Sequence, residues 1–380
     1  MELLKDILVI DFSQFLSGPS ASLRLADLGA RVIKVEKPGQ GDICRQLYVS
    51  NVEIDGESTI FHAINRNKES YTADLKNPDD LSTIKKLIAQ ADVVMHNFRP
   101  GVMERLGLSY EVVRDLKPSI IYAEISGYGT EGSFKDLPGQ DLLLQAISGL
   151  PYLNNNADRP PTPMGVAVVD ILAGTHCAQG ILAALYKKTK TGEGSLVQVS
   201  MLESALDFQF EVLSCFLNDG QLLPQRSKVN HAHAYVAAPY GVYRTEDGYL
   251  ALAMGDILFL GELLDCPDLA VFSERKDWFD RRDEIKLVLA KHLSTNTTEH
   301  WLLKLEPADI WCAEVLNYAE LLQQEGYKGL GMEIIVKTSS GKEVKTTRCP
   351  IKVNGRALKS SIGAPGLGFD TEAINKEFQI

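Results

Sequence analysis

The chain has 380 residues, and its 45% hydrophobic and 23% charged residues are ordinary for a globular protein. This length suffices for a large core and for two domains. The 50 acidic residues outnumber the 39 basic ones, which gives a formal charge of −11. No basic stripe is visible, so nucleic acid is not an expected partner. An anionic ligand would need local cations rather than the field of the whole protein.

The six cysteines stand far apart and form no CxxC pair. This spacing excludes the common zinc and redox motifs, predicts no metal site, and indicates reduced thiols in a cytoplasmic protein. The N-terminus lacks the basic and apolar regions of a signal peptide. The most apolar stretch, 164–186, contains Asp170, His176 and Gln179. We therefore interpret it as a core helix and expect no membrane span.

The first 220 residues alternate strand-like and helix-like segments. In chain order we expect a strand over Ile7–Phe12, a helix from Pro19 to Gly29, a strand over Arg31–Glu36, a helix over Asp80–Ala91, a strand over Asp92–Phe98, a helix over Tyr110–Leu116, a strand over Ser119–Ser126, the apolar helix, a strand over Ser195–Ser200 and a helix over 203–218. Strands separated by helices favour an α/β fold with a doubly wound, Rossmann-like parallel sheet.

The pattern changes after about residue 220, where Tyr240–Met254 alternates like antiparallel strands around a turn. We expect a large Rossmann-like domain made of residues 1–220 and 311–380, which returns to strand and turn character at its end. A smaller α+β domain, 221–310, would be inserted between these two parts.

The loop Ser13–Pro19 joins the first strand to the first helix. Unpaired N–H groups at a helix N-terminus suit a phosphate or a carboxylate. Glu36 ends the second strand, where a NAD-dependent oxidoreductase places its ribose-binding acid. The loop holds only one glycine where the GxGxxG motif needs three. The oxidoreductase is therefore a distant alternative, and the simpler interpretation of Glu36 is a solvated strand end.

A second polar cluster, Asn97–Gly101, follows a predicted strand, and Arg105 comes shortly after it. An aromatic ring, Phe98, beside amide and guanidinium groups suits a base and a phosphate. A loop with a solvated arginine explains the same pattern.

Asp170 is the only charged residue within 164–186. A buried carboxylate is costly unless it is paired, caps a helix or takes part in chemistry. Aspartate is favoured at helix N-caps, and a helix N-terminus also keeps a carboxylate ionised for nucleophilic attack. The residue pattern leaves both roles open. His176, six residues further on, does not share the helix face of Asp170, and we interpret it as a hydrogen-bonded core histidine.

Short segments spread along nearly the whole chain form one specific pattern. They are Val9–Phe12, Ser17–Pro19, Ala30–Gly39, Gly41-Asp42, Asn67-Lys68, Asp74–Lys76, Asn97–Gly101, Leu106-Gly107, Ser126–Gly129, Gln145–Gly149, Val169-Asp170 and, near the C-terminus, Ala364–Gly368. Together they resemble the class III CoA-transferases, the family of the formyl-CoA, oxalate and carnitine CoA-transferases.

The resemblance implies two chains interlocked as a homodimer, each with a Rossmann-like CoA-binding domain and a small inserted domain. It implies that acyl-CoA and small carboxylic acids are the partners, and that CoA is a substrate rather than a permanently bound cofactor. Asp170 would be the nucleophile that forms an aspartyl–acyl anhydride and then an aspartyl–CoA thioester. The family positions that bind CoA match Leu16, Ser17, Lys37, Ala73, Lys76, Asn97, Phe98 and Arg105.

Two alternatives stay open beside the transferase. The α-methylacyl-CoA racemases share the fold and the aspartate, but they use a histidine in a Gly-His-Asp motif that reads Gly139-Gln140-Asp141 here. Glutamine cannot accept a proton at neutral pH, so one of the two bases is missing. We expect Gln140 and Asp141 to line the substrate pocket. The other alternative is a CoA-binding protein without activity.

Two departures from the family pattern bear on specificity. Tyr240–Asp256 lacks the run of glycines of the formyl-CoA transferases, which argues against a formyl or oxalate substrate. Phe369-Asp370 replaces the usual acid–histidine pair.

Overall fold

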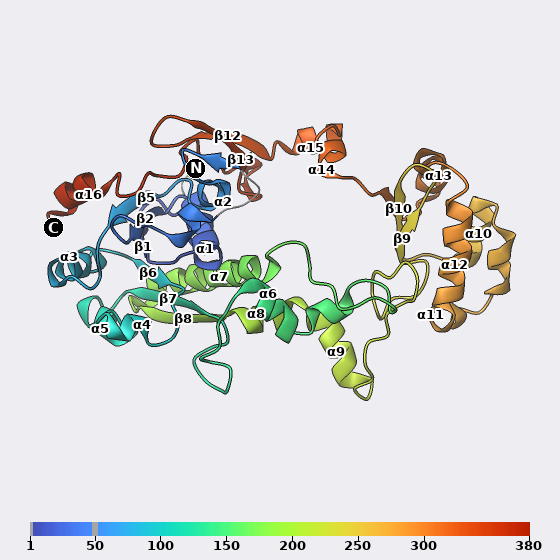
Figure 1. Ribbon diagram of the computed structural model, residues 1–380, viewed down its shortest axis with the longest axis horizontal. Helices are drawn as coiled ribbons and strands as arrows, with labels where there is room; N and C mark the ends of the chain where they lie inside the picture. The colour runs from blue at the N-terminus through green and yellow to red at the C-terminus, as the bar shows by residue number, and fades with distance from the viewer. Residues whose placement is uncertain (1–2, 48–51) are drawn as a thin grey trace. The chain divides into compact units, whose positions relative to one another are not determined.

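The structure, a computed structural model, describes residues 3–47 and 52–380 (Figure 1). The contacts within the chain divide it into two compact units. Unit 1 consists of Met1–Leu144, Ala167–Phe208 and Gly329–Ile380, and unit 2 of Gln145–Val166 and Gln209–Lys328.

Six parallel strands form the main sheet of unit 1, in the order β5-β2-β1-β6-β7-β8. They are β1 (Leu8–Asp11), β2 (Arg31–Glu36), β5 (Glu69–Thr72), β6 (Val93–His96), β7 (Ile121–Ser126) and β8 (Ser195–Ser200). Counted along the chain this is 3-2-1-4-5-6, the strand order of Rossmann folds. The predicted α/β class and parallel sheet are confirmed. The order reverses between β1 and β6, and such sheets bind ligands outside the carboxyl ends of the strands at this point.

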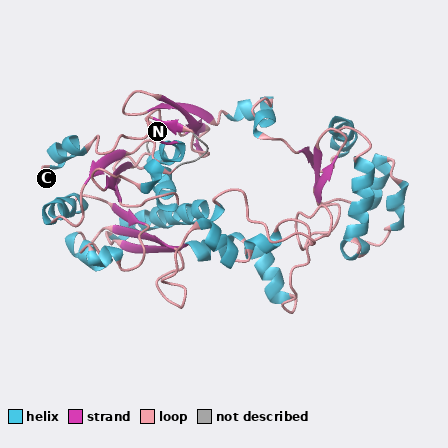
Figure 2. Cartoon of the chain, viewed as in Figure 1, coloured by secondary structure: helices cyan, strands magenta, loops and turns pink. Residues whose placement is uncertain are grey.

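Helices pack on both faces of this sheet (Figure 2). One face carries α1 (Ser17–Asp27), α7 (Val168–Thr191) and α8 (Met201–Phe208), and the other carries α3 (Pro78–Ile88), α5 (Tyr110–Leu116) and α16 (Thr371–Phe378). The other elements of unit 1 are shorter: η1 (Ile43–Gln46), β3 (Glu53–Ile54), β4 (Glu57–Ser58), α2 (Thr59–Ile64), α4 (Val102–Arg105), β12 (Glu333–Lys337), β13 (Glu343–Thr347), β14 (Lys352–Val353) and β15 (Arg356–Ala357).

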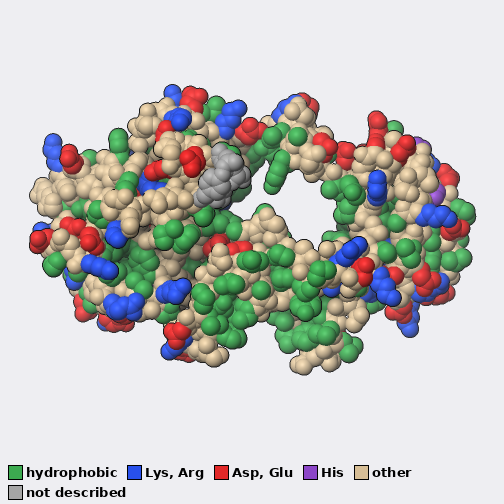
Figure 3. All heavy atoms as spheres, viewed as in Figure 1, with side chains coloured by type: hydrophobic (Ala, Val, Ile, Leu, Met, Phe, Trp, Pro, Cys, Tyr) green, Lys and Arg blue, Asp and Glu red, His purple; other side chains and the backbone are tan. Residues whose placement is uncertain are grey.

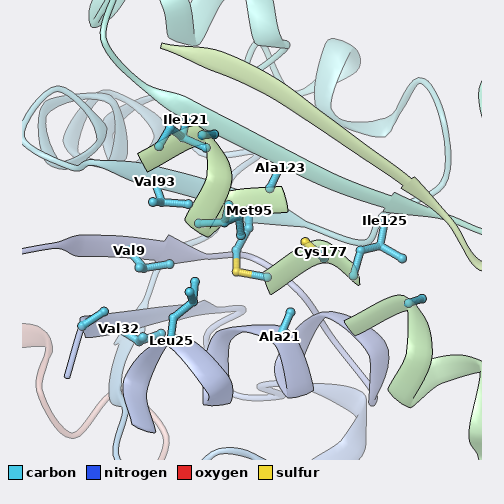
Figure 4. Packing of buried hydrophobic residues seen from close by; sticks show 14 of the residues in the cluster. Val9, Ala21, Leu25, Val32, Val93, Met95, Ile121, Ala123, Ile125 and Cys177 are labelled. Atoms are coloured by element: carbon cyan, nitrogen blue, oxygen red, sulfur yellow. The ribbon is translucent and has the colours of Figure 1, made fainter. Parts of the chain in front are cut away.

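The core beneath α1 and α7 is built from small and branched side chains (Figure 4). Val9 and Met95 of the sheet pack with Ala21 and Leu25 of α1 and with Cys177 of α7. Apolar residues run continuously along these strands because a parallel sheet is covered on both faces.

Helix α7 is long and apolar enough to cross a membrane by length and composition alone. Val169, Ala173, Cys177 and Ile181 are fully buried in the core of unit 1. Their spacing of four residues defines one apolar stripe that faces the sheet and α1. We conclude that α7 is a core helix.

One predicted element is wrong in its extent. The single helix expected over 203–218 is two helices, α8 (Met201–Phe208) and α9 (Phe210–Asn218). Gln209 separates them because its backbone leaves the helical region, with φ −97° and ψ 12°. The two helices also belong to different units.

Unit 2 has its own core around an antiparallel sheet with the order β11-β10-β9. Its elements are α6 (Asp141–Ile147, which begins in unit 1), η2 (Leu150–Leu153), α9, β9 (Gly241–Arg244), β10 (Tyr249–Leu252), α10 (Ile257–Leu264), η3 (Pro267–Val271), α11 (Asp277–Asp280), α12 (Arg282–Leu293), α13 (Thr298–Leu305), η4 (Glu306–Ala308), β11 (Cys312–Glu314), α14 (Tyr318–Leu321) and α15 (Glu325–Leu330, which ends in unit 1). The antiparallel strands expected within Tyr240–Met254 are present as β9 and β10.

Unit 2 is larger than the expected small domain of residues 221–310. It also contains residues 145–166, 209–220 and 311–328, which we expected in the large domain. Long-range contacts account for the difference. Strand β11 pairs with β10, and the Ala157 N–H donates to the Ser227 carbonyl oxygen at 2.9 Å.

Candidate active site

Asp170 lies in the first turn of α7 but does not cap it. The N-cap residue is Ala167, and Asp170 is the third residue of the helix. The N-terminus is capped instead by another acid. The Asp141 Oδ1 atom accepts the backbone N–H groups of Val169 at 2.8 Å and Asp170 at 3.2 Å. Two of the unpaired donors of the helix are thereby satisfied, and of the two roles left open for Asp170 the structure excludes the cap.

The carboxylate of Asp170 bonds to the start of α1. The hydroxyl and the backbone N–H of Ser17 are the hydrogen-bond donors that act on it, and both lower its pKa. Burial is the larger influence, followed by the negative charge of Asp141, and together they raise the pKa of Asp170 to about 6. This carboxylate is ionised at neutral pH, and it is more basic than a solvated one.

Gly174 allows α1 and α7 to approach closely enough for this contact. A Cβ atom at Gly174 would lie 2.1 Å from the Ser20 Oγ atom and 2.6 Å from the Ser17 carbonyl oxygen. No side chain fits there without moving the backbone of α1. Since Gly174 is one turn beyond Asp170, it sets the separation of the two N-terminal turns.

Asp141 is positioned by a loop whose two ends touch. A Cβ atom at Gly139 would lie 2.7 Å from the Cα atom of Gly127, so the backbones pack directly against each other. The carbonyl oxygen of Gln140 then accepts the N–H groups of Leu143 and Leu144 at the start of α6. The structure thus brings Asp141 next to Asp170, while Gln140 is exposed.

The residues predicted to contact CoA follow the carboxyl ends of four neighbouring strands. Leu16 and Ser17 follow β1, Lys37 follows β2, Ala73 and Lys76 follow β5, and Asn97 and Phe98 follow β6, with Arg105 at the end of α4. Adjacent parallel strands end at one edge of a sheet, so these residues share the edge at which ligands bind.

Asn97 ties this edge together. Its Oδ1 atom accepts the Gln14 N–H at 2.8 Å, and its Nδ2 atom donates to the Gln14 carbonyl oxygen at 2.8 Å and to the Ser17 Oγ atom at 3.2 Å. The side chain therefore fixes the loop after β1 and orients the hydroxyl that donates to Asp170. Its role here is at least partly structural.

Three of the predicted residues are cations with exposed side chains. Within the described residues, Lys37, Lys76 and Arg105 form no ion pair, and Lys37 donates to the Gln40 side chain at 3.1 Å. Phe98 is half-buried, and its ring stacks on His96 at 5.9 Å between centroids. This edge therefore offers unpaired positive charge in a protein whose net charge is negative.

Glu36 fits neither of the roles considered for it. Its side chain is buried, and its two oxygens each accept a hydrogen bond from Arg45 at 2.7 Å. The Ser70 hydroxyl also donates to it. An acid committed to these partners is not a solvated strand end and cannot bind a ribose, which removes the main support for an oxidoreductase.

His176 is hydrogen-bonded, as expected, although it is only half-buried. Its Nδ1 atom lies 3.0 Å from the Ser204 Oγ atom, and its Nε2 atom lies 3.3 Å from Asp207. No group of His, Cys, Asp and Glu side chains suited to a metal ion occurs among the described residues.

Sequence reasoning missed a set of buried charges beneath the loop after β1. Asp11, Lys34, Asp42 and Lys68 are all buried. Their signal was present in the sequence, since Lys34 interrupts the apolar strand Arg31–Glu36 and Asp11 ends another. Buried charges in such positions require partners.

The sheet, the carboxyl edge and the acid on α7 define the class of the protein. Residues 4–371 match the model of CoA-transferase family III, and the chain belongs to this family. It is thus a class III CoA-transferase, with relatives of known activity.

One relative is the acetyl-CoA:oxalate CoA-transferase of Acetobacter aceti, which is 34% identical over 98% of this chain and 95% of its own. Another is the human succinyl-CoA:glutarate CoA-transferase, which is 31% identical over 98% and 85% of the two chains. Among solved structures, a CaiB/BaiF family protein from Brucella suis has a TM-score of 0.85 at 27% identity over 99% of both chains.

Proposed function

We propose that this protein moves CoA from an acyl-CoA donor to a small carboxylic acid and that Asp170 is the nucleophile. One observation carries the proposal. The Asp170 carboxylate has a pKa raised to about 6, its hydrogen-bonding influences are the neutral donors of Ser17, and it forms no ion pair within the described residues. An ion pair with a cation would lower the nucleophilicity of the carboxylate, whereas neutral donors lower it less.

The proposed reaction passes through two kinds of acyl intermediate. The Asp170 carboxylate attacks the thioester carbonyl, and CoA thiolate leaves as the aspartyl–acyl anhydride forms. The thiolate attacks the aspartyl carbonyl, releases the donor acid and leaves an aspartyl–CoA thioester. The acceptor carboxylate attacks this thioester, expels the thiolate and forms a second anhydride with Asp170. The thiolate then attacks the acceptor carbonyl of this anhydride, which gives the new acyl-CoA and regenerates the Asp170 carboxylate.

The donors from Ser17 suit this sequence. Each attack on the aspartyl carbonyl places negative charge on an oxygen of Asp170. The N–H and hydroxyl groups of Ser17 already act on this carboxyl group in the resting protein. Donors fixed before the reaction stabilise a developing oxyanion without having to reorganise.

CoA would lie along the carboxyl edge of the sheet. Lys37, Lys76 and Arg105 supply exposed cations without ionic partners, which suits the phosphates of CoA. Phe98 supplies a half-buried ring beside them. These assignments rest on the family positions and on the common edge at which the residues lie.

The substrates are proposed as a class. The relatives are named for acetyl-CoA or succinyl-CoA as donor and for oxalate or glutarate as acceptor, so we infer short acyl-CoA donors and small mono- or dicarboxylic acids. Tyr240–Asp256 has no run of glycines, which argues against a formyl or oxalate substrate. A panel of acyl-CoA donors and acids, followed by mass spectrometry of the CoA esters, tests this. Transfer to no carboxylic acid in the panel would contradict the proposal.

Racemisation is not favoured, because the position of the family's histidine base is Gln140. A racemase would exchange the α-proton of a 2-methylacyl-CoA with solvent deuterium. We expect no such exchange, and rapid exchange without CoA transfer would instead support the racemase.

We also propose that the protein is a homodimer. Helix α9 has no buried residue, and its Phe210 and Leu217 are 67% and 58% exposed. Figure 3 shows hydrophobic side chains over this part of unit 2. A helix that exposes large apolar side chains is typical of a protein interface, and a second copy of the chain is the occupant that the family resemblance implies.

A further inference from the structure

A buried ion pair lies beneath the loop that leads to Ser17. The Nζ atom of Lys34, on β2, is 2.8 Å from the Oδ2 atom of Asp42, and both side chains are completely buried. The pair lies in a larger group of buried charges, since Asp11 and Glu36 also act on Lys34 and Lys68 is 3.6 Å from Asp11. None of these groups is assigned a part in the proposed reaction.

Both members of the pair also form hydrogen bonds with the backbone of the loop after β1. The Lys34 Nζ atom donates to the Ser13 carbonyl oxygen at 2.6 Å, and the Asp42 Oδ1 atom accepts the Phe15 N–H at 3.1 Å. Between these two contacts, Asn97 bonds to both backbone groups of Gln14. Three consecutive residues are thus held by side chains rather than by regular secondary structure.

The loop needs this support because Phe15 has a left-handed backbone, with φ of 64°. A large side chain rarely adopts this conformation, which is unfavourable unless surrounding contacts impose it. The Phe15 ring is 46% exposed, so burial of the ring does not impose it. The side-chain bonds to Ser13, Gln14 and Phe15 are the contacts that do.

We propose that Lys34 and Asp42 are positioning residues for CoA transfer. They hold Phe15 in its left-handed conformation, and the following turn therefore directs the N–H and hydroxyl of Ser17 at Asp170. This inference rests on the proposed function, because it assigns the pair to the reaction at Asp170. Buried ion pairs are often no more stabilising than apolar residues of the same size. Positioning gives a reason for this pair where stability does not.

The test is the double variant Lys34→Met/Asp42→Asn. It removes both charges together, so neither is left buried alone, and the asparagine keeps an oxygen for the Phe15 N–H. We expect a folded protein by circular dichroism, a fall in kcat of about 10- to 100-fold, and a change of less than about threefold in the KM for acyl-CoA. The surface pair of the half-buried Lys304 and the exposed Asp265, at 2.7 Å in unit 2, gives the matched control Lys304→Met/Asp265→Asn, which should keep the wild-type kcat.

A rescue experiment separates positioning from a general effect on stability. Glycine adopts a positive φ without strain, whereas alanine does not. Adding Phe15→Gly to the double variant should restore at least about threefold of the lost kcat, and adding Phe15→Ala should restore none. If the double variant does not fold, Lys34→Gln/Asp42→Asn decides the question by the same loss of kcat and the same rescue. It removes both charges, keeps a polar group at each position and shortens the side chain that reaches the Ser13 carbonyl oxygen.

Wild-type kcat in the folded double variant, or equal rescue by glycine and alanine, would overturn the positioning role. The proposed nucleophile is judged by a different protein, Asp170→Asn. Retained transfer in that variant would contradict the proposed function. The positioning role of Lys34 and Asp42 is judged separately, from the kcat of the Lys34→Met/Asp42→Asn variant.

Discussion

Asp141 caps the helix that carries Asp170: its Oδ1 atom accepts the Asp170 backbone N–H at 3.2 Å, and its charge raises the pKa of the Asp170 carboxyl group. One side chain therefore fixes the position of the nucleophile and tunes its basicity. The two effects can be separated, because asparagine keeps the capping oxygen but carries no charge.

The first prediction concerns the pH dependence of transfer. Only the ionised Asp170 attacks, so kcat/KM should fall as the pH is lowered through about 6. Asp141→Asn removes the nearby negative charge, which lowers the pKa of Asp170 and moves the acid limb to lower pH. The measurement is kcat/KM of the wild type and of Asp141→Asn from about pH 4.5 to about pH 8. An acid limb at the same pH in both would show that the charge of Asp141 does not act on Asp170.

The second prediction concerns the contact between α1 and α7. Gly174→Ala places a methyl group against Ser17 and Ser20. It should lower the free energy of unfolding by roughly 1–3 kcal/mol. It should also lower kcat by about tenfold or more, because Ser17 moves away from Asp170.

The control for this variant is Gly326→Ala in α15, where a Cβ atom meets nothing within 4 Å. It should leave kcat unchanged and should not lower the free energy of unfolding, because alanine favours a helix more than glycine does. Denaturant unfolding and steady-state kinetics measure the two effects, and wild-type kcat in Gly174→Ala would show that this approach is not needed for activity.

The third prediction tests the CoA contacts. Lys37→Ala and Arg105→Ala should each raise the KM for acyl-CoA by about 10- to 100-fold with a smaller effect on kcat, because a charge-assisted phosphate bond contributes roughly 1.5–3 kcal/mol. Lys345→Ala, at an exposed position of β13, is the control for a general loss of positive charge. An unchanged KM in both test variants would place the CoA phosphates elsewhere.

The fourth prediction is the oligomeric state. Light scattering at micromolar concentration should give about twice the chain mass of 41.9 kDa. Phe210→Asp together with Leu217→Asp should weaken the dimer if α9 lies in the interface. A wild-type protein of single-chain mass would contradict the proposal.

Much of the fold could be predicted from the sequence. The alternation of apolar strands with helices identified the parallel sheet, and Tyr110–Leu116 matches α5 residue for residue. The helix pattern over 203–218 hid the break at Gln209, because nothing in the local periodicity marks it. Contacts across the chain, such as the pairing of β10 with β11, decided the extent of unit 2 and are not encoded locally.

The candidate site was only partly predictable. Asp170 stood out as the single charge in an apolar segment. The partners that define its chemistry, Ser17 and Asp141, come from helices 153 and 29 residues away in the chain and meet it only through close helix packing. The Lys34–Asp42 pair was missed because a lysine in a strand is ordinarily interpreted as solvent-facing.

The central claim is tested most directly by trapping the acyl group on Asp170. Asp170→Asn keeps the shape of the side chain but is a far poorer nucleophile. Because the wild-type pKa is raised in the folded protein, its carboxylate lowers stability as the pH rises from about 4 to about 6, and Asp170→Asn should melt no lower than wild type at pH 7. A loss of activity in this variant is therefore not a loss of fold.

The measurement is peptide mass spectrometry after incubation with acyl-CoA and then hydroxylamine. The account predicts a hydroxamate on the wild-type peptide that contains Asp170, no modification of that peptide in Asp170→Asn, and CoA transfer reduced to background in the variant. Transfer at the wild-type rate by a folded Asp170→Asn or Asp170→Ala protein would contradict it.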